Sequence, residues 1–178
     1  TSSNGPEVTF IGSTTNSNYV IKFGAIAGTG AELSGFTVRG STASAAMEVT
    51  AGSPLITGNR FLDNPVDLLV IICRNSNATI SRNLFVGNGG ISCIGMGPGA
   101  QAFITNNTFD LNARGFYGVG GLAIGKNNII SRCTDYGVFG TSQRTYNDIW
   151  SNSPNYDGGA MPGWGDISED PRFVDPVN

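Results

Sequence analysis

The chain has 178 residues, a mass of 18.5 kDa, a net charge of −3 and a pI near 4.7. This length suits one domain with a single core, and the acidic balance offers no basic face for nucleic acid. No apolar run approaches the roughly 18 residues of a membrane span. Histidine is absent, which excludes Ser-His-Asp and Cys-His nucleophiles, a histidine general base and His-ligated zinc.

Residues that form turns dominate the composition. Charged residues make up only 13%, while Gly (26) and Asn (18) together fill about a quarter of the chain, so strands and turns are favoured over helices or disorder. Cys73, Cys93 and Cys133 show no C-x-x-C spacing. We expect buried thiols, with one disulfide and a leftover thiol as the alternative. The start at Thr1 suggests a mature or excised piece.

An internal repeat is the main signal along the chain. Its template is an apolar residue, two spacers, Asn, one spacer, an apolar residue, two spacers and Asn, as in Ile56-Thr-Gly-Asn59-Arg-Phe61-Leu-Asp-Asn64. A degenerate copy precedes it and four copies follow, with spacings of 23, 24, 24, 20 and 20 residues. The copies begin at Leu33, Ile56, Ile80, Ile104, Ile124 and Arg144.

The repeat predicts columns of like residues. A second apolar column comprises Met47, Val70, Ile94, Tyr117 and Val138. The first Asn of each copy recurs at a turn, where Asn tolerates the left-handed backbone and its amide can pair with the Asn of the next coil. We therefore predict a structural ladder of Asn59, Asn83, Asn107, Asn127 and Asn147.

Two repeat architectures have this period. Leucine-rich repeats need Leu-dominated columns, whereas this chain has only eight Leu and its columns are Ile, Phe and Val. The sequence instead predicts an all-β, single-domain right-handed parallel β-helix of six or seven coils, in which coils stack about 4.8 Å apart. We expect residues 1–156 to form the coils and residues 157–178 to form a C-terminal tail that caps the end of the same domain.

The chain resembles the secreted right-handed β-helix proteins of the pectin-lyase-like superfamily. The Asn/Phe template carries this resemblance, together with four segments: Asn4–Gly12, Leu33–Gly40, Tyr146–Tyr156 and Asp170–Pro176. It implies a secreted or cell-surface location and the β-helix fold. It does not imply one activity, because the superfamily includes lyases, hydrolases, epimerases and binding domains.

Catalytic motifs of such families are missing. The chain has no Asp-Asp pair and no Gly-His-Gly, and Asp170-Pro171 is followed by Arg172 and Phe173 where the related epimerases have His-Glu. An enzyme would need an Arg, Lys or Tyr base. We therefore expect a non-catalytic extracellular module, structural or carbohydrate-interacting, and keep a polysaccharide lyase acting on acidic glycans as the alternative.

Two groups of residues are candidates for binding carbohydrate. Arg82 and Lys126 are predicted to occupy the same position in their copies of the repeat, with Asn106 between them. These residues would form either a polar stripe that binds an acidic sugar or an ordinary solvated face of a sheet. Aromatic residues are concentrated in the last coil and the tail, where the repeat becomes irregular. Two interpretations are open: the rings stack on sugar rings, or they close the end of the core. These aromatic residues are Tyr146, Trp150, Tyr156 and Trp164.

The two ends of the chain suggest further alternatives. Four acidic residues fall within Asp166–Asp175. They could form a calcium site, although the Asp-x-Asp-x-Gly pattern of such sites is missing. A solvated acidic tail is the alternative. No cofactor is otherwise expected. An uncovered first coil would expose unpaired backbone groups, so head-to-tail stacking into a filament is a third reading.

Overall fold

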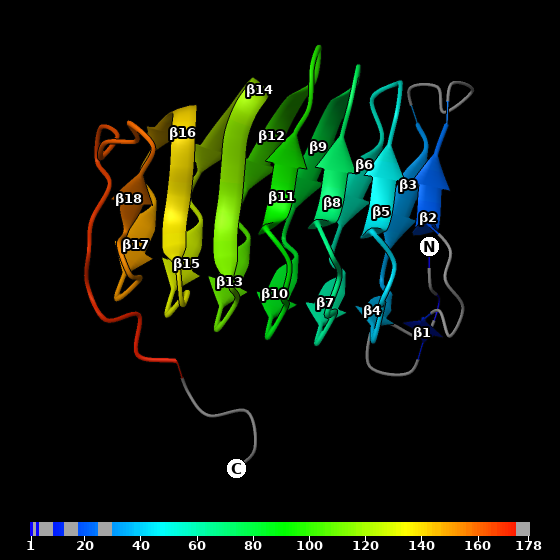
Figure 1. Ribbon diagram of the computed structural model, residues 1–178, viewed down its shortest axis with the longest axis horizontal. Coiled ribbons are helices and arrows are strands. Elements are labelled where there is room, and N and C mark those ends of the chain that lie inside the picture. Colours follow the sequence, from blue (N-terminus) through cyan, green and yellow to red (C-terminus); the bar gives the residue numbers. More distant parts are fainter. Residues whose placement is uncertain (2, 4–8, 13–17, 25–29, 174–178) are drawn as a thin grey trace.

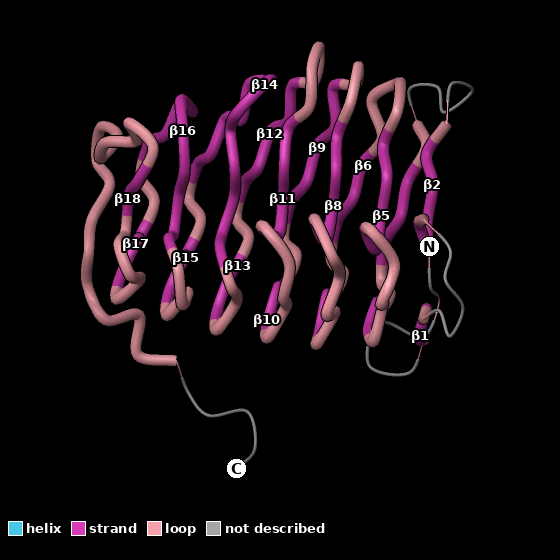
Figure 2. Tube along the Cα trace, viewed as in Figure 1, coloured by secondary structure: helices cyan, strands magenta, loops and turns pink. Residues whose placement is uncertain are grey.

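The computed structural model describes residues 1, 3, 9–12, 18–24 and 30–173, and every regular element within them is a strand. The chain winds into a right-handed parallel β-helix of about six coils, which confirms the predicted fold (Figures 1 and 2). The part of the chain that the structure describes has no helix long and apolar enough to cross a membrane.

The strands stack in three parallel rows. The first row contains β1 (Phe10–Ile11), β4 (Thr37–Arg39), β7 (Arg60–Leu62), β10 (Leu84–Val86), β13 (Thr108–Asp110), β15 (Ile129–Ser131) and β17 (Asp148–Trp150). The second contains β2 (Tyr19–Phe23), β5 (Ala45–Val49), β8 (Leu69–Cys73), β11 (Ser92–Met96) and β18 (Tyr156–Asp157). The third contains β3 (Glu32–Ser34), β6 (Leu55–Thr57), β9 (Asn77–Ser81) and β12 (Gln101–Thr105). Two long strands, β14 (Arg114–Lys126) and β16 (Tyr136–Thr145), run on from the second row into the third.

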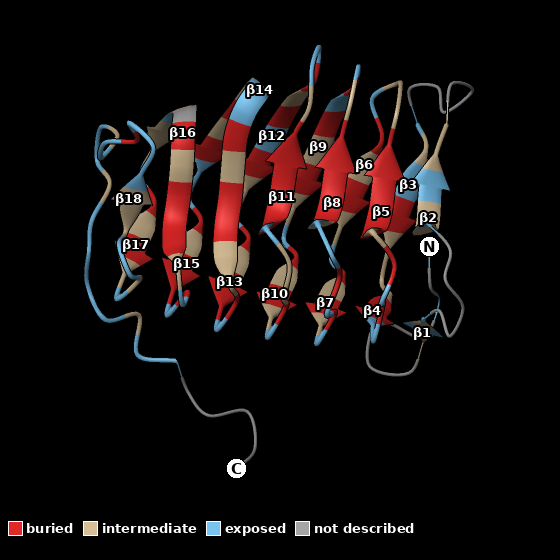
Figure 3. Cartoon of the chain, in the orientation of Figure 1, coloured by how far each residue is buried: buried red, intermediate tan, exposed pale blue. Residues whose placement is uncertain are grey.

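Like residues stack along the core. The rings of Phe61, Phe85 and Phe109 are parallel, with centroids 4.8 and 4.7 Å apart, and Ile130 and Ile149 continue their column in β15 and β17. All five side chains are fully buried, and each such burial stabilises the fold by about 1.5–3 kcal/mol. Figure 3 shows the contrast between these buried strands and the exposed segment after β18.

The asparagine ladder forms between the third and first rows. Asn83 is typical: its Oδ1 accepts hydrogen bonds from the backbone N–H (3.0 Å) and Nδ2 (3.1 Å) of Asn59. Its own Nδ2 donates to the carbonyl of Ile56 (2.9 Å) and to Oδ1 of Asn107 (3.0 Å). Because every polar atom of the buried amide has a partner, its burial costs little.

One predicted member of this ladder is wrong. Asn127 is exposed, whereas Asn128 is buried and accepts hydrogen bonds from the backbone N–H (2.9 Å) and Nδ2 (3.1 Å) of Asn107. The copy begins at Gly125, which pairs with Ile104. Glycine is favoured there because a Cβ would lie 2.9 Å from Cζ of Phe116, whose ring takes the interior space that isoleucine fills in earlier coils.

The predicted second apolar column is also wrong by one residue in two coils. Ile71 pairs with Met47 and Ile94, and Phe116 pairs with Ile94 and Val138. Val70 is buried beside this column. Tyr117, in contrast, pairs with Gly95 and stacks on the ring of Phe139 at 5.1 Å, so it belongs to a neighbouring column.

A second ladder joins Asn64, Asn88 and Asn112 through hydrogen bonds of 2.8 and 2.9 Å. Cys133 occupies the next position, and its backbone N–H donates to Oδ1 of Asn152 at 2.9 Å. All three cysteines are buried and free, which confirms the thiol prediction over a disulfide. Burial raises the pKa of Cys73 and of Cys133 to about 12.

The tail continues the stacking beyond β17. Asp166 takes the next place in the first ladder: its Oδ1 accepts from the backbone N–H (2.8 Å) and Nδ2 (2.9 Å) of Asn147. Its Oδ2 accepts from the N–H of Gly163 at 2.7 Å. A carboxylate accepts but cannot donate, so the ladder ends at Asp166 without leaving a side-chain donor unpaired.

Candidate functional site

The turn between the third and first rows carries one left-handed residue in each coil. Such a backbone favours glycine and asparagine and is strained for other residues. We call this column the turn edge. It consists of Gly35 (φ 77°), Gly58 (62°), Arg82 (54°), Asn106 (57°), Asn127 (55°), Tyr146 (57°) and Gly165 (73°). The four side chains in the middle of the column are exposed, so the turn edge presents a line of polar and aromatic groups to solvent.

The predicted pairing of Arg82 with Lys126 in one slot is wrong. Lys126 pairs with Thr105 in β12 and with Thr145 in β16, one position before the turn edge. Arg82 and Asn127 share the left-handed position instead. The cause is the one-residue shift at Gly125 described above, so the two cations do not form a continuous stripe.

Three of the predicted residues do come together at the last turns. The rings of Tyr146 and Trp164 meet edge to face with centroids 4.8 Å apart, and Nζ of Lys126 lies 5.7 Å from the centroid of Tyr146. Trp164 is 74% exposed and Tyr146 45%. We call Lys126, Tyr146 and Trp164 the aromatic corner. It offers an exposed ring surface beside a positive charge, a combination suited to an amphipathic anion.

Arg82 lies further along the same edge. It lines a shallow depression of about 440 Å³ together with Arg60 and Asn106. Three coil steps separate Arg82 from Tyr146, which is about 14 Å at the usual strand spacing. A ligand that ran along the turn edge would therefore meet a guanidinium at one end and the aromatic corner at the other.

Trp150 and Tyr156 lie elsewhere. Trp150 is on the outside of β17, where it lines a depression of about 230 Å³ together with Arg132 and residues 170–173 of the tail. Tyr156 is half-buried against the end of the core, and the centroid of its ring lies 5.6 Å from Cζ of Arg144. Burial, reinforced by the charge of Asp166, raises the pKa of the Tyr156 hydroxyl to about 12. The structure therefore does not combine the four aromatic candidates into one surface.

An ionic cluster that the sequence did not indicate lies on the second row. Glu48 is 4% exposed and contacts Lys22 (2.9 Å) and Arg74 (2.5 Å) from the neighbouring coils. Burial would raise the pKa of Glu48, but hydrogen bonds from Lys22 and Tyr19 and the two positive charges outweigh it and hold the pKa below its usual value. The repeat gave no signal, because Lys22, Glu48 and Arg74 lie outside the positions of the template.

Asp166 and Arg144 were also missed as site residues. Arg144 was visible in the sequence as a charge in the first apolar slot of its copy, but its surroundings were not. Asp166 follows Asn147 in the ladder, beyond the last copy of the repeat, so the template gave no signal for it. Within the described residues no group of three or more acidic or cysteine side chains is arranged to hold a metal ion. Asp175 of the predicted acidic segment lies outside the described residues.

A family model described as "Right handed beta helix region" matches residues 23–161, well over half of the chain. The chain belongs to the right-handed β-helix family. No curated protein and no solved structure gives a match. Membership of the β-helix family supports a structural or carbohydrate-related module in general and specifies neither a ligand nor a reaction.

Proposed function

We propose that this β-helix protein is a non-catalytic, secreted or cell-surface module that binds an acidic polysaccharide along its turn edge. The aromatic corner carries the proposal. Tyr146 and Trp164 expose ring surface, and the ammonium of Lys126 lies beside them. Ring faces suit the apolar faces of sugars, and a lysine provides the charge partner of a uronate carboxylate.

The geometry of the turn edge supports a chain-like ligand. One exposed side chain per coil follows the solenoid axis, from Arg82 through Asn106 and Asn127 to Tyr146. The coil spacing of about 4.8 Å is comparable to the length of one sugar ring in a polysaccharide. An extended acidic chain can therefore place successive units over successive coils, with Arg60 and Arg82 near its far end.

Tryptophan fluorescence provides the test, because the chain has only two tryptophans. In a Trp150→Phe background Trp164 is the sole reporter. We expect oligogalacturonates to change its emission saturably and matched neutral oligosaccharides to have little effect. Lys126→Gln should weaken binding by about tenfold, as expected for loss of one charge-assisted contact. Tyr146→Asn, which keeps a residue tolerant of the left-handed backbone, should weaken it similarly.

Arg39→Gln provides the matched control. Arg39 is an exposed cation at the end of β4, away from the turn edge, so this change removes the same charge without touching the aromatic corner. The proposal fails if Trp164 does not respond to any acidic oligosaccharide. It also fails if Arg39→Gln and Lys126→Gln weaken binding equally, because that result would indicate non-specific attraction.

A lyase remains the second candidate, because Glu48 meets Lys22 and Arg74 from adjacent coils beside the hydroxyl of Tyr19. This is the cation–carboxylate arrangement that an enzyme on this fold would need without histidine. The ultraviolet absorbance of unsaturated uronates tests it directly. Formation of such a product by the purified protein, abolished in Lys22→Gln and Arg74→Gln, would replace the binding proposal with an enzymatic one.

A further inference from the structure

Arg144 occupies an interior position of the solenoid. In the strand register it follows Ile104 and Gly125, in the column whose earlier members Ile56 and Ile80 are fully buried. A guanidinium in such a column needs compensation, because a charge withdrawn from water is costly unless it is paired.

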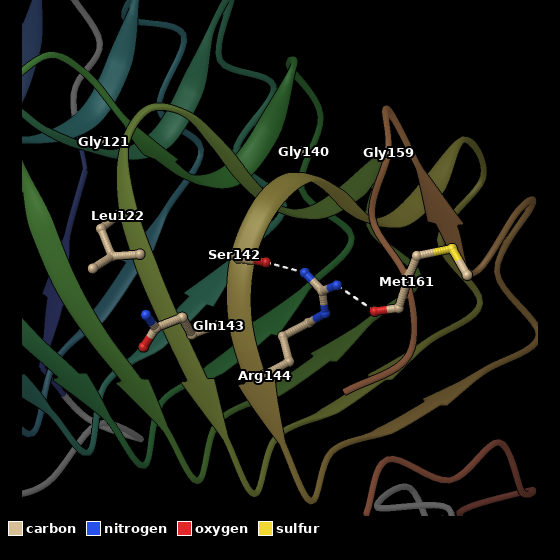
Figure 4. Close-up of a pocket in the computed structure, with 8 residues that line it drawn as sticks. All are labelled: Gly121, Leu122, Gly140, Ser142, Gln143, Arg144, Gly159 and Met161. Atoms are coloured by element: carbon tan, nitrogen blue, oxygen red, sulfur yellow. Dashed lines mark hydrogen bonds between the residues drawn. The ribbon is translucent and has the colours of Figure 1, made fainter. Parts of the chain in front are cut away.

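The partners of Arg144 are all neutral. Its two Nη atoms donate to Oγ of Ser142 and to the backbone carbonyl of Met161 (Figure 4). A third donor, Nε, is buried without a hydrogen-bond partner among the described residues. Burial lowers the pKa of Arg144, and the nearby charge of Asp166 only partly opposes this effect.

Two other half-buried arginines, Arg74 and Arg114, differ from Arg144. Arg74 meets Glu48, and Arg114 meets Asp135, each through a direct ion pair. No carboxylate among the described residues lies within ion-pair distance of Arg144. Only the ring of Tyr156, 5.6 Å from Cζ, and the more distant charge of Asp166 offset its positive charge, so the guanidinium has no direct ionic partner among the described residues.

A depression of about 410 Å³ lies beside this arginine, within the usual size range of small-molecule sites. Ser142, Met161 and three glycines of successive coils contribute to its lining. A Cβ on one of these glycines, Gly159, would meet nothing within 4 Å, so the space at that point is open. Figure 4 shows Ser142 and Arg144 of β16 projecting toward the segment of Met161, whereas Gln143 projects from the opposite side of β16, toward Leu122 of β14. Leu122 and Gln143 also line the depression.

We propose that this depression binds the carboxylate of a small sugar acid, with Arg144 as the charged donor. The choice of a sugar acid rests on the proposed function, but the site is separate from the aromatic corner. Two of the five guanidinium N–H groups are used by the protein and one is buried, so the remaining Nη hydrogens are available to a carboxylate.

Calorimetric titration with D-galacturonate tests the site. We expect saturable binding to the wild-type chain and no comparable binding of galactose, which lacks the carboxylate. Arg144→Met should reduce affinity at least about tenfold, as loss of a charge-assisted hydrogen bond predicts. Arg114→Met is the matched control, since that arginine is already paired with Asp135, and should bind galacturonate normally.

Three results would overturn the proposal: no binding of galacturonate to the wild-type chain, equal binding by Arg144→Met, or equally tight binding of inorganic sulfate. If Arg144→Met does not fold, amide chemical shifts of the wild-type protein decide instead. They should move at Ser142 and Met161, and shifts confined to other regions would refute the site. Trp164→Ala separates the two proposals, because it should remove polysaccharide binding and leave galacturonate binding intact.

Discussion

The middle coils and the last coils follow different rules. Between Ile56 and Asn112 the ladder repeats every 24 residues, and phenylalanine stacks on phenylalanine. After Asn112 the steps of the first ladder shorten to 21 and 19 residues, and single residues depart from their columns. Gly125 accommodates the ring of Phe116, and Cys133 replaces a ladder asparagine.

This difference shows where the fold tolerates special chemistry. A middle coil is covered on both sides by near copies of itself, so each position needs the same residue type. A last coil has a partner that differs from it, which allows a charge such as Arg144 inside and exposed aromatic rings such as Trp164 outside. The aromatic corner and the depression beside Arg144 both lie in this second region.

The largest expected effect is a difference in core packing between the middle coils and the last coils. Phe85→Ala removes the central ring of the stack and should lower the free energy of unfolding by about 3–5 kcal/mol, since the cavity is closed on all sides. Phe139→Ala removes a half-exposed ring and should cost only about 1–2 kcal/mol. Urea denaturation measures both, and equal losses would show that the last coils are packed as tightly as the middle.

The ladder provides the next contrast. Asn83→Ala removes the acceptor of the Asn59 backbone N–H and the side-chain donor to the carbonyl of Ile56, whereas Nδ2 of Asn59 keeps its hydrogen bond to the carbonyl of Leu33. The loss should cost about 3 kcal/mol. Asp166→Asn keeps the oxygen that accepts from Asn147 but replaces the acceptor of the Gly163 N–H with an NH2 donor, and should cost about 1–2 kcal/mol. Asn127→Gly is the control outside the ladder and should be nearly neutral. A large loss in that control would refute the corrected register.

The fit of Gly125 to Phe116 is a smaller effect. Gly125→Ala brings a methyl group against the Phe116 ring and should cost about 1–3 kcal/mol. Adding Phe116→Leu should relieve the clash, so the double variant should lose less than the sum of the two single losses. Additive losses in the same denaturation experiment would mean that the two residues do not compete for space.

Restoring the ladder at Cys133 should have the smallest effect. Cys133→Asn supplies an amide between Asn112 and Asn152 and should add up to about 1 kcal/mol of stability at neutral pH. Burial raises the folded pKa of this thiol from 9 to about 12. Its contribution to stability is therefore present below pH 9 and is lost as the pH rises toward 12.

Thermal unfolding from pH 7 to pH 11 checks this effect. Wild-type stability should fall more steeply above pH 9 than that of Cys133→Asn, while Cys73 and Cys93 contribute to both slopes. Identical slopes in the two proteins would contradict the assigned burial of the Cys133 thiol.

The sequence predicted the regular part of the fold well because its signal is repetition. Asn59, Asn83, Asn107 and Asn147 lie in the ladder as predicted. The prediction failed at Asn127, because two adjacent asparagines and an isoleucine at 124 fit the template one residue too early. The observed register leaves room for the Phe116 ring beside Gly125, and such a contact between coils is not visible in the repeat template.

The candidate site was less predictable. The concentration of aromatic residues near the end made Tyr146 and Trp164 candidates, but the contact between their rings depends on how the tail returns along β16. The same concentration included Trp150 and Tyr156, which lie elsewhere. Arg144 was recognised as occupying an apolar slot, yet its lack of a carboxylate partner depends on the three-dimensional neighbourhood.

The most direct test of the binding account is an amide chemical-shift map of the ¹⁵N-labelled protein with an acidic oligosaccharide. We predict saturable shifts at Lys126, Asn127, Tyr146 and Trp164, extending along the turn edge toward Arg82. A map with no saturable shifts, or with shifts confined to the second row around Glu48, would contradict the proposal that the turn edge is the carbohydrate-binding surface.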